Sequence, residues 1–182
     1  MSWKSSMDIQ EVRAFLKKNF DGPEVIEALR FRLQTHLEDP TLDPLSNQVW
    51  PAYLELPRHI EEPFTILDAG CMSGFLYHHL KKYFKDFTYT GVDRWKEALE
   101  VGREFAPEAT FIQSDFLKDD LPGQYDYVVC SNIPFKGNEL ALATAMLLQN
   151  SRRRLFIIHP DAEIDIIVRT PTGASITRHS RS

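Results

Sequence analysis

The sequence of 182 residues has few cysteines and no long hydrophobic run. Its two cysteines, Cys71 and Cys130, lie far apart and in no CxxC or histidine-rich context, so they form no zinc site by themselves and suggest no disulfide framework. No apolar stretch approaches the roughly 20 residues that span a bilayer, and the N-terminus lacks the apolar core of a signal peptide. We expect a cytoplasmic protein with reduced thiols, no metal site and no membrane partner.

Positive charge is also scarce. The chain carries 21 Lys and Arg residues against 26 Asp and Glu residues, a formal net charge of −5. A protein that grips nucleic acid neutralises phosphates with clustered Lys and Arg, and this composition disfavours such a role. The locally basic segment 151–182 is typical of a solvated face or tail. The charge therefore favours a small-molecule or peptide partner over RNA, and the hydrophobic content of 43% is enough for one substantial core.

Residues 1–60 are predicted to form a helical cap and a connector. An apolar stripe made by Ile9, Val12 and Leu16 predicts a helix that starts at Asp8 and ends before residue 21. A second helical pattern begins around residue 23, with apolar residues at every fourth position. Four prolines between residues 44 and 63 predict an irregular connector that contributes a lid. Residues 1–60 as a whole are equally suited to a lid or to a dimer contact, and the sequence predicts no oligomeric state.

From residue 64 onward, short apolar runs alternate with helical patterns. Strands are predicted over residues 64–70, 87–93, 109–115, 125–132 and 154–160, and helices over residues 74–84, 95–106 and 138–151. Strands separated by helical crossovers predict an α/β domain over residues 61–182, with a mostly parallel twisted sheet and helices on both faces. Two further strands, 163–170 and 173–180, predict an antiparallel hairpin that closes one edge.

Polar residues follow four of the predicted strands. They are Asp68 in the stretch LDAGCMSG, then Asp93, Asp115 and Asn132. A single acidic residue after a strand is usually a helix N-cap or a turn residue. In a parallel sheet, however, the carboxyl ends of the strands meet at one edge, which is where ligands bind. Four polar strand ends together therefore indicate a ligand site at that edge.

The glycine pattern after the first strand separates two cofactor classes. A dinucleotide requires G-x-G-x-x-G so that backbone amides approach the pyrophosphate, and Met72 interrupts that pattern. S-adenosylmethionine has no phosphate and requires only a tight turn, an anion near its ammonium group, an acid for its ribose hydroxyls and an acceptor for its adenine amino group. The sequence offers each of these, which favours S-adenosylmethionine and disfavours a nicotinamide-dependent reductase.

Residues 64–135 resemble class I S-adenosylmethionine-dependent methyltransferases, with LDAGCMSG as motif I. The resemblance implies a Rossmann-like methyltransferase fold for the α/β domain. It implies that Asp68 and Gly70 lie near the methionine end of the cofactor, and that Gly74 packs the first helix close to the first strand. Family members usually have Gly where Met72 stands, so the side chain of Met72 is expected to point away from the cofactor.

The same resemblance assigns residues to the adenosine part of the cofactor. It implies that Asp93 accepts the ribose hydroxyls, that Asp115 accepts the adenine amino group, and that Phe116 makes an apolar contact with the adenine. The remaining members of the expected cofactor-binding set are Cys71, Arg94 and Asn132.

The stretch Asn-Ile-Pro-Phe resembles the motif of methyltransferases that modify adenine in ribosomal RNA, of the dimethyladenosine and macrolide-resistance type. That resemblance implies a catalytic set of Asn132, Pro134 and Phe135. The side-chain oxygen of Asn132 and the backbone carbonyl before Pro134 would accept the two hydrogens of an amino nitrogen, and both bonds strengthen as the nitrogen becomes tetrahedral. Phe135 would stack on a planar substrate. The alternative is an ordinary strand-to-helix turn.

Together these patterns predict an enzyme that transfers a methyl group from S-adenosylmethionine to a nitrogen of an unidentified acceptor by in-line displacement. RNA is disfavoured as the acceptor because residues 61–150 contain 8 Lys and Arg residues against 14 Asp and Glu residues. The alternative function is a non-catalytic module that binds S-adenosylmethionine or serves as an interaction module, which the departure at Met72 would suit.

Overall fold

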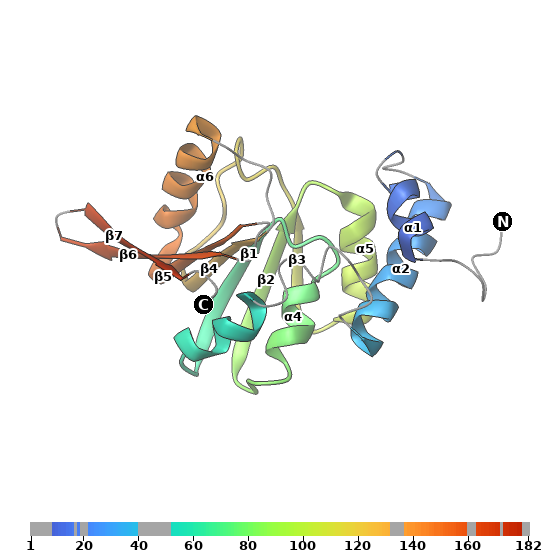
Figure 1. The fold of residues 1–182 in the computed structure, drawn as a ribbon, viewed down its shortest axis with the longest axis horizontal. Helices are drawn as coiled ribbons and strands as arrows, with labels where there is room; N and C mark the ends of the chain where they lie inside the picture. The colour runs from blue at the N-terminus through green and yellow to red at the C-terminus, as the bar shows by residue number, and fades with distance from the viewer. Residues whose placement is uncertain are drawn as a thin grey trace.

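A single sheet forms the centre of the molecule. The structure, a computed structural model, describes residues 9–16, 18, 22–39, 52–131, 137–159, 163–171 and 173–179. The sheet has seven strands in the order β3-β2-β1-β4-β5-β6-β7. Helices cover both of its faces (Figure 1), so the predicted α/β architecture is confirmed. Within the described ranges, no helix has both the length and the apolar composition that a membrane crossing needs.

The strands begin and end close to the residues that periodicity predicts. Their bounds are β1 Phe64–Ala69, β2 Phe87–Asp93, β3 Thr110–Gln113, β4 Tyr125–Ser131, β5 Ser151–Ile158, β6 Ile164–Thr170 and β7 Gly173–His179. Strands β1 to β5 run parallel to one another, and β6 and β7 extend the sheet beyond β5 in antiparallel fashion. The mostly parallel sheet and its C-terminal antiparallel hairpin are both confirmed.

The helices include one short 3-10 helix in the connector. Their bounds are α1 Ile9–Leu16, α2 Pro23–Glu38, η1 Leu56–His59, α4 Phe75–Leu80, α5 Lys96–Phe105 and α6 Asn138–Gln149. Residues 52–55 are helical too and lead directly into η1, so the prediction of an irregular connector was wrong for residues 52–59. Proline is compatible with the first turn of a helix, where its missing N–H is not needed, and Pro57 lies in the first turn of η1.

Two hydrophobic clusters occupy the two faces of the sheet. Successive residues of a strand point to opposite faces, so neighbouring residues of β1 join different clusters. On the α6 side, Leu67 shares a cluster with Leu147 of α6. On the α4 side, Ile66 shares a cluster with Leu76 of α4 and with Leu56 of η1. A strand that is buried on both faces reads as a continuous apolar run, which explains the pattern of β1.

Helices α1 and α2 lie outside α5 rather than on the sheet (Figure 1). Val12 of α1, Leu29 of α2 and Val101 of α5 belong to a third buried group, which we call the cap cluster. Phe75, the first residue of α4, belongs to the same cluster. The N-terminal helices are therefore held both by α5 and by the start of α4, next to the end of β1.

Candidate functional site

The turn between β1 and α4 is tied to the end of the neighbouring strand β2. The backbone N–H groups of Gly70 and Cys71 both donate to the carbonyl of Val92, at 2.8 Å and 3.1 Å. The N–H of Gly74 closes the turn by donating to the carbonyl of Cys71 at 2.9 Å. This turn is the LDAGCMSG motif, and it lies at the carboxyl edge of the sheet, where ligands bind in open parallel sheets.

Gly74 fits this turn for two reasons. Its φ angle is +79°, a left-handed conformation that side chains disfavour. A Cβ atom at this position would also lie 2.9 Å from Cζ of Phe111 in β3. The absence of a side chain lets the start of α4 lie directly against Phe111.

Met72 occupies the left-handed region without being a glycine. Its φ angle is 49°, and its N–H donates to Oδ2 of Asp93 at 2.9 Å. Its side chain packs against the cap cluster, and Nη1 of Arg32 in α2 lies 3.5 Å from its sulfur atom. The cap helices therefore accommodate the side chain of Met72 beside the turn.

Asp93, at the end of β2, is engaged by two backbone amides. Oδ2 accepts the N–H of Met72, and Oδ1 accepts the N–H of Trp95 at 2.9 Å. Burial raises the pKa of Asp93, and the two amide hydrogen bonds oppose that shift. A carboxylate has about four lone-pair positions, so these contacts leave acceptor capacity for hydroxyl groups. The assignment of Asp93 to the ribose hydroxyls stays a prediction.

Asp68 is the most deeply buried of the strand-end acids. It is 1% exposed, and its Oδ2 accepts the hydroxyl of Tyr89 at 2.6 Å. Its Oδ1 is buried and has no hydrogen-bond partner among the described residues, and the same holds for Oγ of Ser73 in the adjacent turn. Burial raises the pKa of Asp68 to about 7, although the hydrogen bond from Tyr89 lowers it. Asp68 Oδ1 is thus suited to a cationic hydrogen-bond donor.

Asp115 lies in the turn after β3 and is held by its own loop. Its Oδ2 forms an ion pair with Lys118 at 2.8 Å, and its Oδ1 accepts the N–H of Leu117 at 3.2 Å. The hydrogen bond to Lys118 is the main reason that the pKa of Asp115 is lowered. The exposed Arg94 at the end of β2 acts in the same direction, so Asp115 and Arg94 are electrostatic neighbours. Asp115 is available as an ionised acceptor.

Two other predicted cofactor residues are buried. Phe116 is 7% exposed and belongs to the α6-side cluster. Cys71 is 4% exposed, and burial raises the pKa of its thiol well above the ordinary value, so it stays protonated. Their contacts with a cofactor stay predictions. Asn132, Pro134 and Phe135 lie outside the described residues.

The end of β4 is contacted by the connector. The Tyr53 hydroxyl and Oγ of Ser131 share a hydrogen bond of 2.9 Å, and Tyr53 is 5% exposed. The backbone carbonyl of Tyr53 lies 2.7 Å from Nε2 of His79 in α4. Burial is the main reason that the pKa of Tyr53 is raised, so its hydroxyl stays neutral at physiological pH. The connector therefore brings an uncharged hydroxyl to the residue directly before Asn132.

Sequence reasoning did not identify Arg32 and Tyr53 as site residues. Arg32 is 4% exposed and sits on the buried stripe of α2 between Leu29 and His36. A charged residue on the apolar stripe of a helix was the available signal, because such a residue is buried only for a specific partner. Tyr53 had no comparable signal in a proline-rich segment.

The geometry fits S-adenosylmethionine better than a phosphate-bearing cofactor. The described groups at the carboxyl edge are mostly acceptors: the carboxylates of Asp68, Asp93 and Asp115. Acceptors suit an ammonium group, two hydroxyls and an amino group, whereas they repel a pyrophosphate. The buried Oδ1 of Asp68 gives the ammonium group an acceptor that no described residue uses.

Comparison with known proteins agrees with this chemistry. A family model described as a methyltransferase domain matches residues 66–154, which run from β1 into β5. No curated protein is significantly similar to the chain in sequence.

Solved structures of methyltransferases share the fold. Magnesium protoporphyrin IX methyltransferase from Synechocystis PCC 6803, with bound S-adenosylmethionine, matches with a TM-score of 0.57 and 16% identity, over 86% of this chain and 77% of that one. Coclaurine N-methyltransferase, bound to N-methylheliamine and S-adenosylhomocysteine, matches with a TM-score of 0.56 and 19% identity, over 65% of this chain and 36% of that one. These likenesses establish a Rossmann-like methyltransferase fold.

A third structure has higher sequence identity. Its description reads "Conversion of a Disulfide Bond into a Thioacetal Group during Echinomycin Biosynthesis". It matches with 28% identity and a TM-score of 0.50, over 59% of this chain and 47% of that one. The chain therefore spans about a third of the coclaurine enzyme and about half of the echinomycin protein.

Proposed function

We propose that this chain, whose residues 66–154 form an S-adenosylmethionine-dependent methyltransferase domain, transfers a methyl group to a nitrogen of a small-molecule or peptide acceptor. The observation that carries the proposal is the turn after β1. There, a buried carboxylate oxygen of Asp68 has no partner among the described residues, directly before the tight turn from Gly70 to Gly74. That combination matches the ammonium group of an amino-acid moiety approaching the backbone closely.

The strand-end acids would hold the cofactor in order along the sheet edge. Asp68 would pair with the ammonium group beside Gly70 and Cys71, Asp93 would accept the ribose hydroxyls, and Asp115 would accept the adenine amino group. Phe116 and Arg94 would flank the adenine. When bound, S-adenosylmethionine supplies an electrophilic methyl group on a sulfonium centre for in-line displacement by the acceptor.

The proposal of a nitrogen acceptor rests on the Asn-Ile-Pro-Phe sequence. Asn132 and the carbonyl before Pro134 would hold the hydrogens of the acceptor nitrogen, and Phe135 would cover a planar acceptor. The hydrogen bond between Tyr53 and Ser131 supports this arrangement, because it fixes the end of β4 from which that sequence starts. A neutral phenol at this point orients groups without removing their protons.

The charge of the domain supports a small acceptor. Residues 61–150 contain 8 Lys and Arg residues against 14 Asp and Glu residues, and this balance repels a polyanion. Coclaurine N-methyltransferase, one of the proteins with the same fold, was solved with N-methylheliamine, a small molecule with a methylated nitrogen. An amine or amide of similar size is the first acceptor class to test, and RNA is the second.

The test combines cofactor binding with turnover. Calorimetry with S-adenosylmethionine and S-adenosylhomocysteine comes first, followed by release of S-adenosylhomocysteine with a panel of amines, amides, peptides and RNA. We expect Asn132→Ala to lower turnover roughly 100-fold or more, because donors and acceptors that act in the transition state have effects of that size. The control is Asn138→Ala, an exposed asparagine at the start of α6.

Two outcomes would contradict the proposal in different ways. Absence of binding heat at high micromolar cofactor would favour a non-catalytic interaction module. Full turnover by Asn132→Ala on the true acceptor would leave the methyltransferase intact and remove the amine-positioning role.

A further inference from the structure

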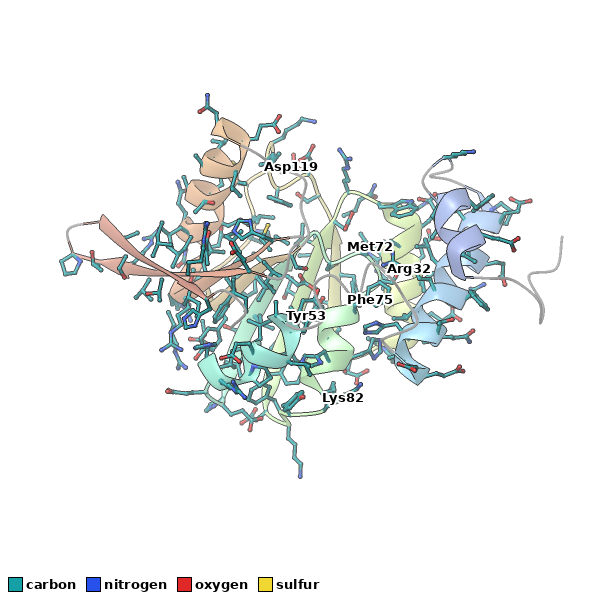
Figure 2. All side chains as sticks on the ribbon, in the orientation of Figure 1. Arg32, Tyr53, Met72, Phe75, Lys82 and Asp119 are labelled. Atoms are coloured by element: carbon teal, nitrogen blue, oxygen red, sulfur yellow. The ribbon has the colours of Figure 1, made fainter. Side chains whose placement is uncertain are left out.

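Arg32 is buried although it carries a permanent positive charge. Its side chain leaves α2 and ends at the β1–α4 turn, where Nη1 lies 3.5 Å from the sulfur of Met72. The guanidinium carbon lies 4.9 Å from the centre of the Phe75 ring, a cation–π contact. Figure 2 shows Arg32, Met72 and Phe75 gathered where α2 meets this turn. The residue is 4% exposed, so its charge is buried beside the β1–α4 turn.

A second observation relates Arg32 to Asp68. The pKa of Tyr53 is raised by burial and by the charge of Asp68, and it is lowered by the charge of Arg32. One phenol therefore feels a buried carboxylate from β1 and a buried guanidinium from α2. These two groups have opposite charges and come from elements that are far apart in the sequence.

We propose that Arg32 binds the carboxylate of the amino-acid end of S-adenosylmethionine while Asp68 binds its ammonium group, an assignment that rests on the proposed function. The amino-acid end is a zwitterion, and a cation and an anion at short separation in the site are complementary to it. A guanidinium presents parallel N–H donors that match the two oxygens of a carboxylate, which a lysine does not. The cap then supplies half of the recognition of the methionine moiety, and the sheet supplies the other half.

The assignment gives the cap a chemical role beyond packing. If Arg32 served only to fill the space between Met72 and Phe75, its replacement by a neutral side chain of similar length would affect all adenosine ligands equally. If Arg32 binds the carboxylate, its replacement weakens the binding only of ligands that possess the carboxylate. This difference separates a structural role from a binding role without any measurement of turnover.

The experiment uses two nucleosides that differ in the amino-acid end. S-adenosylhomocysteine has that end, and 5′-deoxy-5′-methylthioadenosine lacks it. Calorimetry would measure both with the wild-type chain and with Arg32→Met. We expect the substitution to weaken S-adenosylhomocysteine about 10- to 100-fold, because charge-assisted hydrogen bonds are lost, and to change methylthioadenosine binding less than 2-fold.

Matched variants control for folding and for charge. Arg30→Met removes a guanidinium from the same helix, where it is partly exposed and paired with Glu27 and Glu104, and it should change neither affinity. Arg32→Lys keeps the charge but loses the planar fork, and it should weaken S-adenosylhomocysteine several-fold with methylthioadenosine unchanged. This variant decides the matter if Arg32→Met does not fold.

The outcomes distinguish this assignment from the function on which it rests. A wild-type chain that binds neither nucleoside would overturn the proposed function. A wild-type chain that binds S-adenosylhomocysteine, with Arg32 variants that keep its full preference over methylthioadenosine or lose both ligands equally, would overturn the carboxylate assignment alone.

Discussion

The segments before and after the five parallel strands differ in what they add to the sheet: helices at the N-terminal side and an antiparallel hairpin at the C-terminal side. The N-terminal segment adds α1, α2 and residues 52–60, and it sends the buried side chains of Arg32 and Tyr53 to the carboxyl edge of the sheet. The C-terminal hairpin of β6 and β7 lengthens the sheet on the opposite side of the molecule (Figure 1). Strand β7 is exposed along most of its length, and Ile176 at its centre is 64% exposed.

The polar groups of the two segments differ in where they point. In the hairpin, Asp165 accepts two hydrogen bonds from Arg178, and its Oδ2 lies 2.9 Å from Nε2 of His159. These polar side chains therefore contact one another within the hairpin or next to it. In the N-terminal segment, Arg32 and Tyr53 contact residues of the β1–α4 turn and of β4. The N-terminal segment therefore differs from the hairpin in that its buried polar side chains leave their own elements and reach the carboxyl edge of the sheet.

The largest expected effect comes from breaking the cap cluster. Leu29→Ala removes a side chain that is 1% exposed, and we expect the free energy of unfolding to fall by about 2–5 kcal/mol because a cavity forms between α2 and α5. Urea denaturation measures it. Leu142→Ala on α6, where the leucine is 54% exposed, is the control and should change stability by less than about 0.5 kcal/mol. Equal small losses would mean that the cap does not unfold together with the sheet.

The pH dependence of stability is expected to have opposite signs for a residue of the sheet and for a residue that contacts the connector. Asp68 has a pKa of about 7 in the folded chain, above the ordinary 3.8, so its contribution is present at low pH and is lost as pH rises from about 4 to 7. His79, which contacts the Tyr53 carbonyl, has a folded pKa of about 4, below the ordinary 6.5. Its contribution is present above pH 6.5 and is lost as pH falls toward 4.

These opposing dependences are separated by two variants. As pH is lowered from 7 to 4, the stability of wild type relative to Asp68→Asn should rise by up to about 4 kcal/mol. Over the same range, the stability of wild type relative to His79→Gln should fall by up to about 3 kcal/mol. Urea denaturation at half-unit pH steps measures both differences, and two flat curves would show that neither side chain is buried as described.

A smaller effect is expected where the connector meets β4. Tyr53→Phe removes the hydroxyl that is bonded to Ser131, and we expect a loss of about 1 kcal/mol, the usual size for one hydrogen bond. Thermal unfolding measures it. Tyr83→Phe is the matched control, because Tyr83 is 50% exposed and should tolerate the change without a measurable shift. Identical behaviour of the two variants would argue that the connector is not anchored at β4.

The smallest effect is expected in β7. Ile176→Thr keeps a β-branched residue on an exposed strand, so we expect the free energy of unfolding to change by less than about 0.5 kcal/mol. Thermal unfolding at two protein concentrations measures it. A clear loss that depends on concentration would show that the hairpin is covered by a second chain and that the contrast between the two segments is weaker than described.

The positions of the strands in the sequence could be predicted because a strand that is buried on both faces is a short, nearly continuous apolar run. The run from Phe64 to Ala69 is apolar apart from Thr65 and Asp68, and it forms β1. Strand β5 begins at Ser151, three residues before the predicted start, because pairing with β4 includes a polar stretch that has no hydrophobic pattern. Helix α1 is described over Ile9–Leu16, and most of the remaining part of the predicted helix lies outside the described residues.

The site was predictable only where it follows strand ends. Asp68 and Asp93 stand at positions that the fold brings to one edge, so their place could be inferred from topology. The contacts of Arg32 with Met72 and of Tyr53 with Ser131 span 40 and 78 residues of sequence. Contacts of that range depend on how the helices pack, and no local pattern encodes them.

The left-handed backbone at Met72 has a mechanical consequence. A residue with a side chain costs about 1–2 kcal/mol in that conformation, and here the cost is offset by the packing of the thioether among the cap residues. Separation of α2 from α5 would remove that compensation, and the turn after β1 would relax away from its bend. The conformation of this turn and the packing of the N-terminal helices are therefore energetically coupled, so that a ligand that stabilises one of them also stabilises the other.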